Sequence, residues 1–585
     1  MTDLHAVALG DHPADLVITN GRVFSPETGT YDSVDVVVAG DRVADLPTDG
    51  SHAISEATTV IDADGDVVLP GFVDAHTHLD TFQAFEQAYV HALTGGTTTV
   101  VSETDRFARR VGTDGVEGLL DATADLPIRV FATLTPIPFY GAVAGLGPDA
   151  VDPDSLLALA SHPRVAGVGE VFWSRIVGRD DIPLSELVTA VREAGGVVWG
   201  HGAGCHDGKL SAFATVVDND HELLDHGEAE ARARRGITPI GRCGSIRDDI
   251  DFVASADQRV LWGEACLCSD GMWPAELLSD GYMDHVVRRT IDAGVAPETA
   301  FRMATLNPAR HCNLDGLGSL SPGSYADVVV LSDVERVAVE TVVSGGRVVV
   351  EDGEALVEYR SHDYPDDWYD SVTLDVDAER FRVPVRTDGR DGSDRLERRE
   401  TVRAIGYIEG LLSEPQEVVP RVVDDTLVAA PERDVLLMAL LPAREDQPDP
   451  GFTGFVTGLG LESGAVATSD TWGNPGVLVV GADAASMVRA VDHVEALGGG
   501  WVVVRDDEVV AALPTPIAGV CSDTAVETTH SRAEAVRSAL ADSGMTAPQP
   551  LLAIGTLTSI GMPWFKLGFD GYVDVVGDAV VGLWD

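Results

Sequence analysis

The sequence predicts an α/β protein built on a (β/α)8 TIM barrel, with a small β-sandwich built from both flanks and an additional α+β C-terminal domain. Three observations support this prediction. Eight short runs rich in Val, Ile and Thr alternate with helical stretches in the middle of the 585-residue chain. Strand-rich segments lie on either side of these runs. A further region with Gly-rich strand signals follows a charged segment.

The small β-sandwich is predicted from residues 1–68 and 315–355. Residues 14–46 alternate apolar and polar side chains between turn signals, which indicates several short antiparallel strands. Residues 326–353 have the same character. Because the two strand-rich pieces flank one long insert, we expect them to combine into a single small domain.

The barrel is predicted over residues 69–314. Continuous β-branched runs are typical of parallel strands that are buried on both faces. Eight strand–helix units in about 250 residues match the usual size of a (β/α)8 barrel, whose catalytic groups lie at the carboxyl ends of its strands. Those ends are therefore where we expect the chemistry. The eight runs span residues 71–78, 97–103, 128–138, 165–173, 196–204, 215–222, 237–245 and 260–270.

The chain changes character twice after the second strand-rich piece. Residues 356–400 are highly charged and poorly periodic, which favours a solvated linker. Residues 401–585 combine Gly-rich strand signals with amphipathic helical stretches such as residues 484–497. This last region predicts the α+β C-terminal domain.

The chain is strongly acidic, with 95 Asp and Glu against 40 Lys and Arg and a formal net charge of −55. Phosphate binding depends on clustered basic side chains, so we expect neither nucleic acid nor an anionic membrane as a partner. Lys209 and Lys566 are the only lysines. This composition, with few lysines and abundant acidic residues, is similar to that of haloarchaeal proteins. The salt-rich cytoplasm of haloarchaea screens charges over a Debye length of about 3 Å or less.

Cysteine usage and the absence of targeting signals predict a cytoplasmic protein. The six cysteines form no Cys-x-x-Cys pair, which argues against a disulfide framework and a structural zinc ribbon. The first residues lack the positive region and apolar core of a signal peptide. The longest uncharged stretch, residues 545–565, is interrupted by prolines and glycines, so no membrane helix is expected.

A His-x-His triplet ends the first barrel run. His76 and His78 lie two residues apart, so on a strand both imidazoles face the same side and could reach one cation in the barrel mouth. Taken alone, such a pair is more often a chance feature of a loop in a chain with 16 histidines. Its interpretation therefore depends on the other strand ends.

Four more strand ends carry side chains of the kinds that bind metals. Glu170 closes the fourth run, His201 the fifth, His221 the sixth and Asp270 the eighth. A single acidic residue at a strand end could instead cap the following helix. Helix caps would not account for the histidines, so the set as a whole indicates a metal site in the barrel mouth.

This set combines neutral imidazoles with carboxylates, which suit zinc, manganese or ferrous iron. A carboxylate at the position of Glu170 could bridge two cations about 3.5–4 Å apart. Asp270 would lie beside the attacking water, take its proton and pass that proton to the leaving group. The residues therefore indicate a binuclear, metal-dependent hydrolase.

Over nearly its whole length the chain also resembles the adenine deaminase family of the amidohydrolase superfamily. The barrel motifs that carry the resemblance are PGFVDAHTH (70–78), GVGEV (167–171), CSDG (268–271), GYMDHVVRRTIDAGV (281–295) and LSPGSYADVVVL (320–331). The C-terminal motifs GFVTGLGLESGAVATS (454–469) and LPTPIAGVCSD (513–523) look like the extra domain typical of these deaminases. The C-terminal motifs are the more specific part, because many amidohydrolases share the barrel motifs.

The resemblance implies a metal-dependent aminohydrolase that converts adenine and water to hypoxanthine and ammonia in purine salvage. It also implies two divalent cations, Mn²⁺ with Fe²⁺ or Zn²⁺ as alternatives, and we expect a homodimer that acts on a purine base. Asp270 and Glu170 are the implied catalytic residues. The implied metal ligands are His76, His78, Glu170, His201, His221 and Asp270.

Several segments around these residues depart from the family pattern. Residues 103–106 read Glu-Thr-Asp-Arg where the family has an Asp-Pro-His-Glu element, residues 172–173 read Phe-Trp for Met-Asn, and residues 472–476 replace a His-rich element. The implied metal ligands are retained while their surroundings differ. Two alternatives therefore stay open: an amidohydrolase acting on another aminopurine or a cyclic amide or ureide, and a catalytically inactive, ligand-binding homologue.

Overall fold

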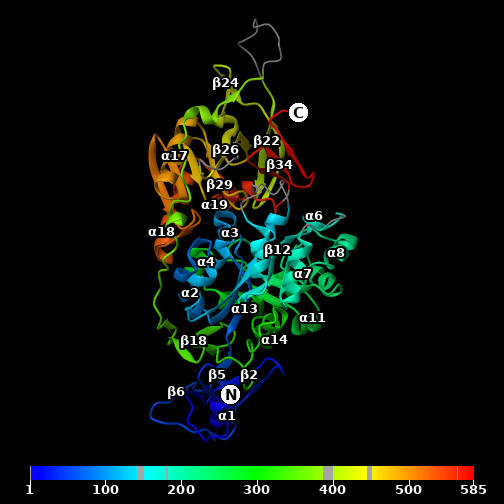
Figure 1. The fold of residues 1–585 in the computed structure, drawn as a ribbon, viewed down its shortest axis with the longest axis vertical. Helices are drawn as coiled ribbons and strands as arrows, with labels where there is room; N and C mark the ends of the chain where they lie inside the picture. Colours follow the sequence, from blue (N-terminus) through cyan, green and yellow to red (C-terminus); the bar gives the residue numbers. More distant parts are fainter. Residues whose placement is uncertain are drawn as a thin grey trace.

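The computed structural model describes residues 2–140, 151–179, 182, 184–386, 400–444, 451–562 and 564–584. Its parts lie one after another along the long axis of the molecule (Figure 1). The N-terminal strands occupy one end, the barrel and its helices the middle, and the C-terminal sheet with its helices the other end. The C-terminal domain therefore lies on the side of the barrel that faces away from the N-terminal strands.

Eight parallel strands form the barrel, one within each predicted run, which confirms the predicted fold class. Neighbouring strands pair in the order β16-β15-β14-β13-β12-β11-β10-β8. The amide of Asp270 donates a 3.1 Å hydrogen bond to the carbonyl of His76, which joins the end of β16 to β8. The strands are β8 (Phe72–Thr77), β10 (Thr97–Ser102), β11 (Arg129–Leu134), β12 (Val165–Phe172), β13 (Val197–His201), β14 (Asn219–Asp220), β15 (Thr238–Arg242) and β16 (Cys266–Cys268).

Amphipathic helices surround these strands. In α13, the buried residues Met283, Val286, Val287 and Thr290 recur at the helical period and form one apolar face. The helices of this region are α2 (Phe85–Thr94), α3 (Asp105–Val111), α4 (Asp114–Ala122), α5 (Pro153–Leu159), α6 (Trp173–Ile176), α7 (Ser185–Glu193), α8 (Asp207–Phe213), α9 (Glu228–Ala233), α10 (Ile250–Ala254), α11 (Gln258–Gly263), α12 (Pro274–Ser279), α13 (Met283–Asp292), α14 (Pro297–Met303) and α15 (Leu306–His311), with η1 (Ile137–Tyr140).

Strands from before and after the barrel share one sheet. β17 pairs antiparallel with β7, so the seven-stranded sheet runs in the order β20-β19-β18-β17-β7-β2-β3, beside a four-stranded sheet ordered β5-β4-β1-β6. Both sheets contribute apolar side chains to one buried cluster. The elements are α1 (Thr2–Ala8), β1 (Leu16–Thr19), β2 (Arg22–Ser25), β3 (Thr30–Asp32), β4 (Val36–Ala39), β5 (Arg42–Asp45), β6 (Thr59–Asp62), β7 (Val67–Pro70), β17 (Val328–Asp333), β18 (Ala338–Ser344), β19 (Arg347–Glu351) and β20 (Glu354–Ala355).

The segment expected as a charged linker contains buried apolar side chains. Residues 387–399 of it lie outside the described part of the chain. Before them, Tyr364 and Trp368 join a buried cluster with barrel and C-terminal residues, and Phe381 joins the C-terminal core. These few aromatic residues anchor an otherwise polar stretch to both of its neighbours. Its elements are α16 (Asp366–Tyr369), η3 (Ala378–Phe381) and β21 (Val383–Pro384).

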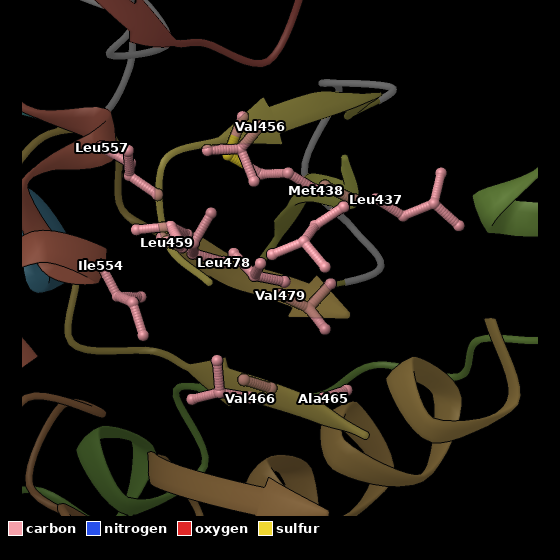
Figure 2. Close-up of a cluster of buried hydrophobic side chains, with 14 of the residues drawn as sticks. Leu437, Met438, Val456, Leu459, Ala465, Val466, Leu478, Val479, Ile554 and Leu557 are labelled. Carbon is pink, nitrogen blue, oxygen red and sulfur yellow. The ribbon is translucent and has the colours of Figure 1, made fainter. Parts of the chain in front are cut away.

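The C-terminal region folds around an eight-stranded sheet ordered β23-β22-β27-β26-β29-β28-β30-β31. Its apolar side chains, including Leu437, Val466 and Ile554, pack into one large core (Figure 2). The elements are β22 (Val402–Glu409), β23 (Leu412–Val418), β24 (Arg421–Val423), β25 (Thr426–Val428), η4 (Pro431–Arg433), β26 (Leu436–Pro442), β27 (Phe452–Thr457), β28 (Ala465–Thr468), β29 (Gly476–Gly481), α17 (Ala484–Ala496), β30 (Gly500–Arg505), β31 (Glu508–Pro514), β32 (Cys521–Ser522), α18 (Val526–Asp542), α19 (Pro550–Gly555), η5 (Thr556–Thr558), β33 (Phe565–Leu567), β34 (Tyr572–Asp574) and β35 (Ala579–Val581).

A short strand pair ties this region to the barrel. β32 lies parallel to β9 (Phe82–Gln83), which belongs to the loop after the first barrel strand. The C-terminal domain is thereby held against the carboxyl ends of the barrel strands. Among the described residues, none of the helices combines the length and apolar character needed to traverse a lipid bilayer.

One buried lysine predicts that the stability of the fold depends on pH. Lys566, in β33, is 1% exposed, and its ammonium group donates to the carbonyl of Leu411 at 3.0 Å. Burial lowers the pKa of Lys566 to about 7. Between that value and the ordinary lysine pKa of about 10.4, the unfolded chain binds the proton that the folded chain releases. The free energy of unfolding should therefore rise with pH by about 1.4 kcal/mol per pH unit in this window.

Replacement of Lys566 by methionine should remove this rise. Denaturant unfolding at pH 7, 8 and 9 in molar KCl, with wild type and Lys566→Met side by side, isolates the contribution of this residue from other titrations. Equal slopes against pH for the two proteins would show that Lys566 keeps an ordinary pKa in the fold.

Candidate metal centre

The side chain of Glu170, at the end of β12, lies at the centre of a histidine cluster. Its Oε1 atom is 3.4 Å from His76 Nε2, 3.4 Å from His201 Nδ1 and 3.0 Å from His221 Nε2. These imidazoles come from the ends of β8 and β13 and from the residue that follows β14. The parallel barrel brings the four side chains together because their strands all end at the same rim.

Asp270 and His78 complete the set predicted from the sequence. Asp270 Oδ1 lies 3.2 Å from His76 Nε2 and 3.7 Å from His78 Nε2. Asp270 has a left-handed backbone with φ of 52°, a conformation uncommon outside glycine and more frequent at functional sites. The structure thus brings all six predicted residues to one place. His78 lies at the edge of the set, because its shortest contact with another member, 3.7 Å to Asp270, is longer than the shortest contact of each other member.

Two overlapping groups of ligand atoms lie within this set. The ligand atoms of His76, Glu170, His221 and Asp270 all lie within 4.8 Å of one another, as do those of His201, His221 and Glu222. Metal–ligand bonds of about 2.1 Å place tetrahedral ligands roughly 3.4 Å apart, which matches the observed spacings. Neither ring nitrogen of His221 makes a hydrogen bond within the described part of the chain. Buried imidazoles of this kind, mixed with carboxylates, fit divalent zinc, manganese or iron.

The electrostatics of the cluster reflect close packing of opposite charges. Burial by itself would lower the pKa of His201, but the neighbouring carboxylates of Glu222 and Glu170 raise that pKa to about 9. Burial raises the pKa of Glu170, and the surrounding histidines more than reverse this and lower its pKa well below the usual range. Burial likewise raises the pKa of Asp270, but nearby positive charges lower it below the usual range, and the guanidinium of Arg242 contributes most to this lowering. Both carboxyl groups are therefore ionised at neutral pH and able to bind cations.

Two charged residues that were not predicted from the sequence, Glu222 and Arg242, contact the predicted set. Arg242 ends β15, and its Nη1 atom lies 2.5 Å from Glu222 Oε1 and 2.8 Å from Asp270 Oδ2. Its Nη2 atom contacts Asp249 at 2.6 Å. Glu222 directly follows His221 in the sequence, and Arg242 lies in the seventh run, for which no candidate was named. A search of every strand end for charged side chains would have found both.

A buried ion pair beneath the centre links two of the ligand-bearing strands. Asp220 Oδ1 accepts hydrogen bonds from the amides of Gly202 and Glu222, each at 3.0 Å. Its Oδ2 lies 2.8 Å from Arg232 Nε, and both side chains are fully buried. Asp220 thereby holds the residues that follow His201 and His221 in place.

Removal of Arg232 should strongly destabilise the fold. Arg232→Met would leave the carboxylate of Asp220 buried without its counter-charge, which should lower the free energy of unfolding by about 4 kcal/mol. Denaturant unfolding in molar KCl measures this loss. The exposed pair of Arg234 and Glu230 provides the control, because Arg234→Met should change stability by less than about 1 kcal/mol. A similar loss of unfolding free energy in both variants would contradict a stabilising role for the buried pair of Arg232 and Asp220.

The candidate metal centre opens into a cavity with walls from both the barrel and the C-terminal domain. Barrel residues that line it include His78, Arg109 and Phe172, and the opposite wall includes Trp472 and Gly473. A larger cavity of about 1430 Å³ lies next to it and shares some of the same lining residues. The C-terminal domain therefore encloses the site rather than standing apart from it, as pockets between domains commonly do.

Comparison with known proteins places the chain among the amidohydrolases. The profile of the adenine deaminase C-terminal domain matches residues 411–578, and amidohydrolase family profiles match residues 59–129 and 212–349. An adenine deaminase of Moorella thermoacetica is 33% identical over 594 residues, which cover 99% of this chain and 97% of that protein. The chain belongs to the adenine deaminase family. An adenine deaminase of Methanothrix thermoacetophila is 30% identical, covering 98% of this chain and 97% of its own, and one of Kosmotoga olearia is 28% identical, covering 99% and 98%.

Within this member of the adenine deaminase family, the segments that depart from the family pattern surround the metal centre. Glu103 Oε1 lies 3.5 Å from His76 Nδ1, and Asp105 Oδ1 lies 3.7 Å from His78 Nδ1. The ring of Phe172 packs edge-on against His201 at 5.1 Å. Trp472 lies on the cavity wall. The departures therefore change what touches the histidines and the cavity, and not the predicted ligands themselves.

Proposed function

We propose that this chain is an adenine deaminase that hydrolyses adenine to hypoxanthine and ammonia with two divalent cations, Mn²⁺ foremost and Fe²⁺ or Zn²⁺ as alternatives. The observation that carries the proposal is the convergence of three imidazole nitrogens on one oxygen of Glu170, in a chain that matches adenine deaminases from end to end. The proposed ligands are His76, His78, Glu170, His201, His221 and Asp270.

When bound, the cations supply Lewis-acid activation of the attacking water. Glu170 would help to hold these cations, because one of its oxygens faces histidines from three different strands. Its negative charge offsets part of the cationic charge in a buried site, which an amide or hydroxyl could not do.

Asp270 is the proposed proton carrier. Its Oδ1 faces His76 and His78, while Oδ2 is held by Arg242, so the carboxylate has a defined orientation in the cavity. Asp270 takes one proton from water as the oxygen bonds to C6 of adenine and the C6–N1 π electrons move to N1. It then gives that proton to the exocyclic nitrogen, the exocyclic C6–N bond breaks, and ammonia leaves. The second proton of the water moves from the oxygen to N1, which gives hypoxanthine.

The cavity suits a flat heterocycle. Apolar and aromatic side chains, among them Ile137, Phe172 and Trp472, line it together with a few charged groups. Because Trp472 lies in a segment that differs from the family pattern, an amidohydrolase for another aminopurine or a cyclic amide or ureide is the second candidate. A catalytically inactive ligand-binding protein is the third.

The test is a substrate screen under high salt. Protein purified in molar KCl and loaded with Mn²⁺ is incubated with adenine, other aminopurines and cyclic ureides, and ammonia release and ring opening are followed. We expect turnover of adenine. Turnover of another substrate class without adenine would favour the second candidate, and metal binding without any turnover would favour the third.

We further propose that the protein works in a salt-rich cytoplasm, as a homodimer, in purine salvage. The excess of 95 acidic over 40 basic residues and the presence of only two lysines support a halophilic, haloarchaeal setting. Unfolding midpoints measured from dilute buffer to molar KCl test the salt requirement. Light scattering in the same buffers tests the dimer.

A further inference from the structure

A short barrel helix anchors the C-terminal domain next to the metal centre. Helix α3 carries Arg106, Arg109 and Arg110, and all three reach across to C-terminal residues. Arg106 Nη2 lies 2.6 Å from Asp470 Oδ1, and Arg109 Nη1 donates to the carbonyl of Gly473 at 2.8 Å. Arg110 donates to two further C-terminal carbonyls, those of Ser469 and Gly476.

Of these three arginines, Arg109 also contacts the surroundings of a predicted metal ligand. Its Nη2 atom lies 2.7 Å from Asp105 Oδ2, and its Nε atom donates to the Asp105 carbonyl at 3.1 Å. The side chain of Arg109 is 5% exposed, so water competes little for these contacts. Arg109 therefore connects Asp105 to the backbone of the C-terminal domain.

The other oxygen of Asp105 faces His78. Asp105 Oδ1 is 3.7 Å from His78 Nδ1 and has no hydrogen-bond partner among the described residues. His78 Nε2, on the opposite side of the ring, faces Asp270 at 3.7 Å. One ring nitrogen of His78 thus points to the proposed cations and the other to a carboxylate.

The neighbouring histidine has a parallel arrangement. Glu103 Oε1 lies 3.5 Å from His76 Nδ1, and the amide of Glu103 donates to the carbonyl of Thr77 at 2.9 Å. Two carboxylates spaced two residues apart therefore match two histidines with the same spacing. This register follows from the parallel pairing of β8 with β10, in which Thr77 lies opposite Ser102.

We propose that Asp105 and Arg109 are positioning residues that orient His78 for cation binding, and that the C-terminal domain completes this arrangement through the carbonyl of Gly473. The inference rests on the proposed function, because it assigns His78 to the cation site. A histidine that binds metal commonly donates its other ring N–H to a carboxylate, which sets the tautomer and ring orientation. Asp105 Oδ1, 3.7 Å from Nδ1, would fill this accepting role when the cation is bound, which would leave Nε2 free to bind that cation.

The backbone carbonyl of Gly473, in the C-terminal domain, is well suited to hold Arg109. Gly473 lies so close to its neighbours that an added Cβ would come within 1.7 Å of the carbonyl of Thr558, and its amide faces Thr558 Oγ1 at 3.2 Å. The backbone at Gly473 therefore has little freedom to move. Asp105 and Gly473 both lie in segments that depart from the family pattern, residues 103–106 and 472–476.

The experiment compares Mn²⁺ affinity in wild type, Asp105→Asn, Arg109→Gln, the double variant and Arg110→Gln, by calorimetric titration of the full chain in molar KCl. Arg110 is the matched control, since it also binds C-terminal carbonyls but does not contact Asp105 and does not line the cavity. Loss of a carboxylate partner of this kind costs about 10–100-fold in metal affinity. We expect that loss in Asp105→Asn and Arg109→Gln, and no larger loss in the double variant.

Arg110→Gln should lower the unfolding temperature of the metal-free protein while it keeps wild-type Mn²⁺ affinity. The inference is overturned if Arg109→Gln binds Mn²⁺ within twofold of wild type, or if Arg110→Gln weakens binding as much as Arg109→Gln does. If Arg109→Gln does not fold, Asp105→Asn against Arg110→Gln decides the question. Failure of the wild type to bind Mn²⁺ would instead contradict the proposed function, so the two failures are distinguishable.

Discussion

Asp270→Asn should lower kcat for ammonia release from adenine by about 10²–10⁴-fold, the usual contribution of a positioned proton carrier. An amide has the size of the carboxyl group and can still present an oxygen to a cation, but it cannot accept and return a proton. The measurement is steady-state deamination in molar KCl, with the metal content of each preparation determined in parallel. Because Asp270 is also one of the proposed ligands, both proteins are assayed at saturating Mn²⁺, and kcat is calculated per metal-loaded site.

Asp249→Asn is the control for this variant. Asp249 shares Arg242 with Asp270, at 2.6 Å and 2.8 Å respectively, but does not line the cavity. We expect its kcat to fall less than about 10-fold, because the loss of one partner of Arg242 leaves the proton carrier in place. A comparable loss in both variants would assign the effect of Asp270 to its ion pair rather than to proton transfer.

Glu170→Gln should abolish tight cation binding. Changes to a residue that only supports a ligand already cost about 10–100-fold in metal affinity, so the loss of a carboxylate that faces three histidines should cost more than about 100-fold. The buried cluster would also lose the negative charge that offsets the cations. Titration with Mn²⁺, together with metal analysis after dialysis, measures the effect.

Glu103→Gln is the comparison variant for this experiment, with a smaller expected loss of metal affinity. Among the described residues, the one histidine with which Glu103 makes an ion-pair contact is His76, at Nδ1 on the side away from Glu170, so its replacement should fall within the 10–100-fold range. Equal effects at Glu103 and Glu170 would contradict a central position for Glu170. Wild-type affinity in Glu170→Gln would remove Glu170 from the ligand set.

The barrel could be predicted from the sequence because its strands are buried on both faces. Seven of the eight predicted runs contain strands of three or more residues, whereas the sixth run contains only Asn219–Asp220. That run includes polar residues whose side chains serve the site, and Asp220 has its hydrogen bonds with neighbouring loops and with Arg232. Because its polar side chains bind residues around the site, this sixth strand lacks the continuous apolar pattern of the others and is the shortest of the eight.

The segment between barrel and C-terminal domain was less predictable. Its acidic composition favours a solvated linker, yet Trp368 is 2% exposed and packs against Gly118 of the barrel helix α4. Composition averages over a segment, whereas one large aromatic side chain is enough to anchor it.

By itself, the sequence determined the barrel, the six candidate residues at its strand ends and the family that the chain resembles. These follow from local periodicity and from the rule that parallel strands end at one rim. Only the tertiary structure decided what surrounds those residues. The contact of Arg109 with Gly473 joins residues 364 positions apart, and Arg242 joins Glu222, Asp249 and Asp270 from separate loops. No local pattern marks such partners, because their choice depends on how the C-terminal domain and the barrel loops pack together.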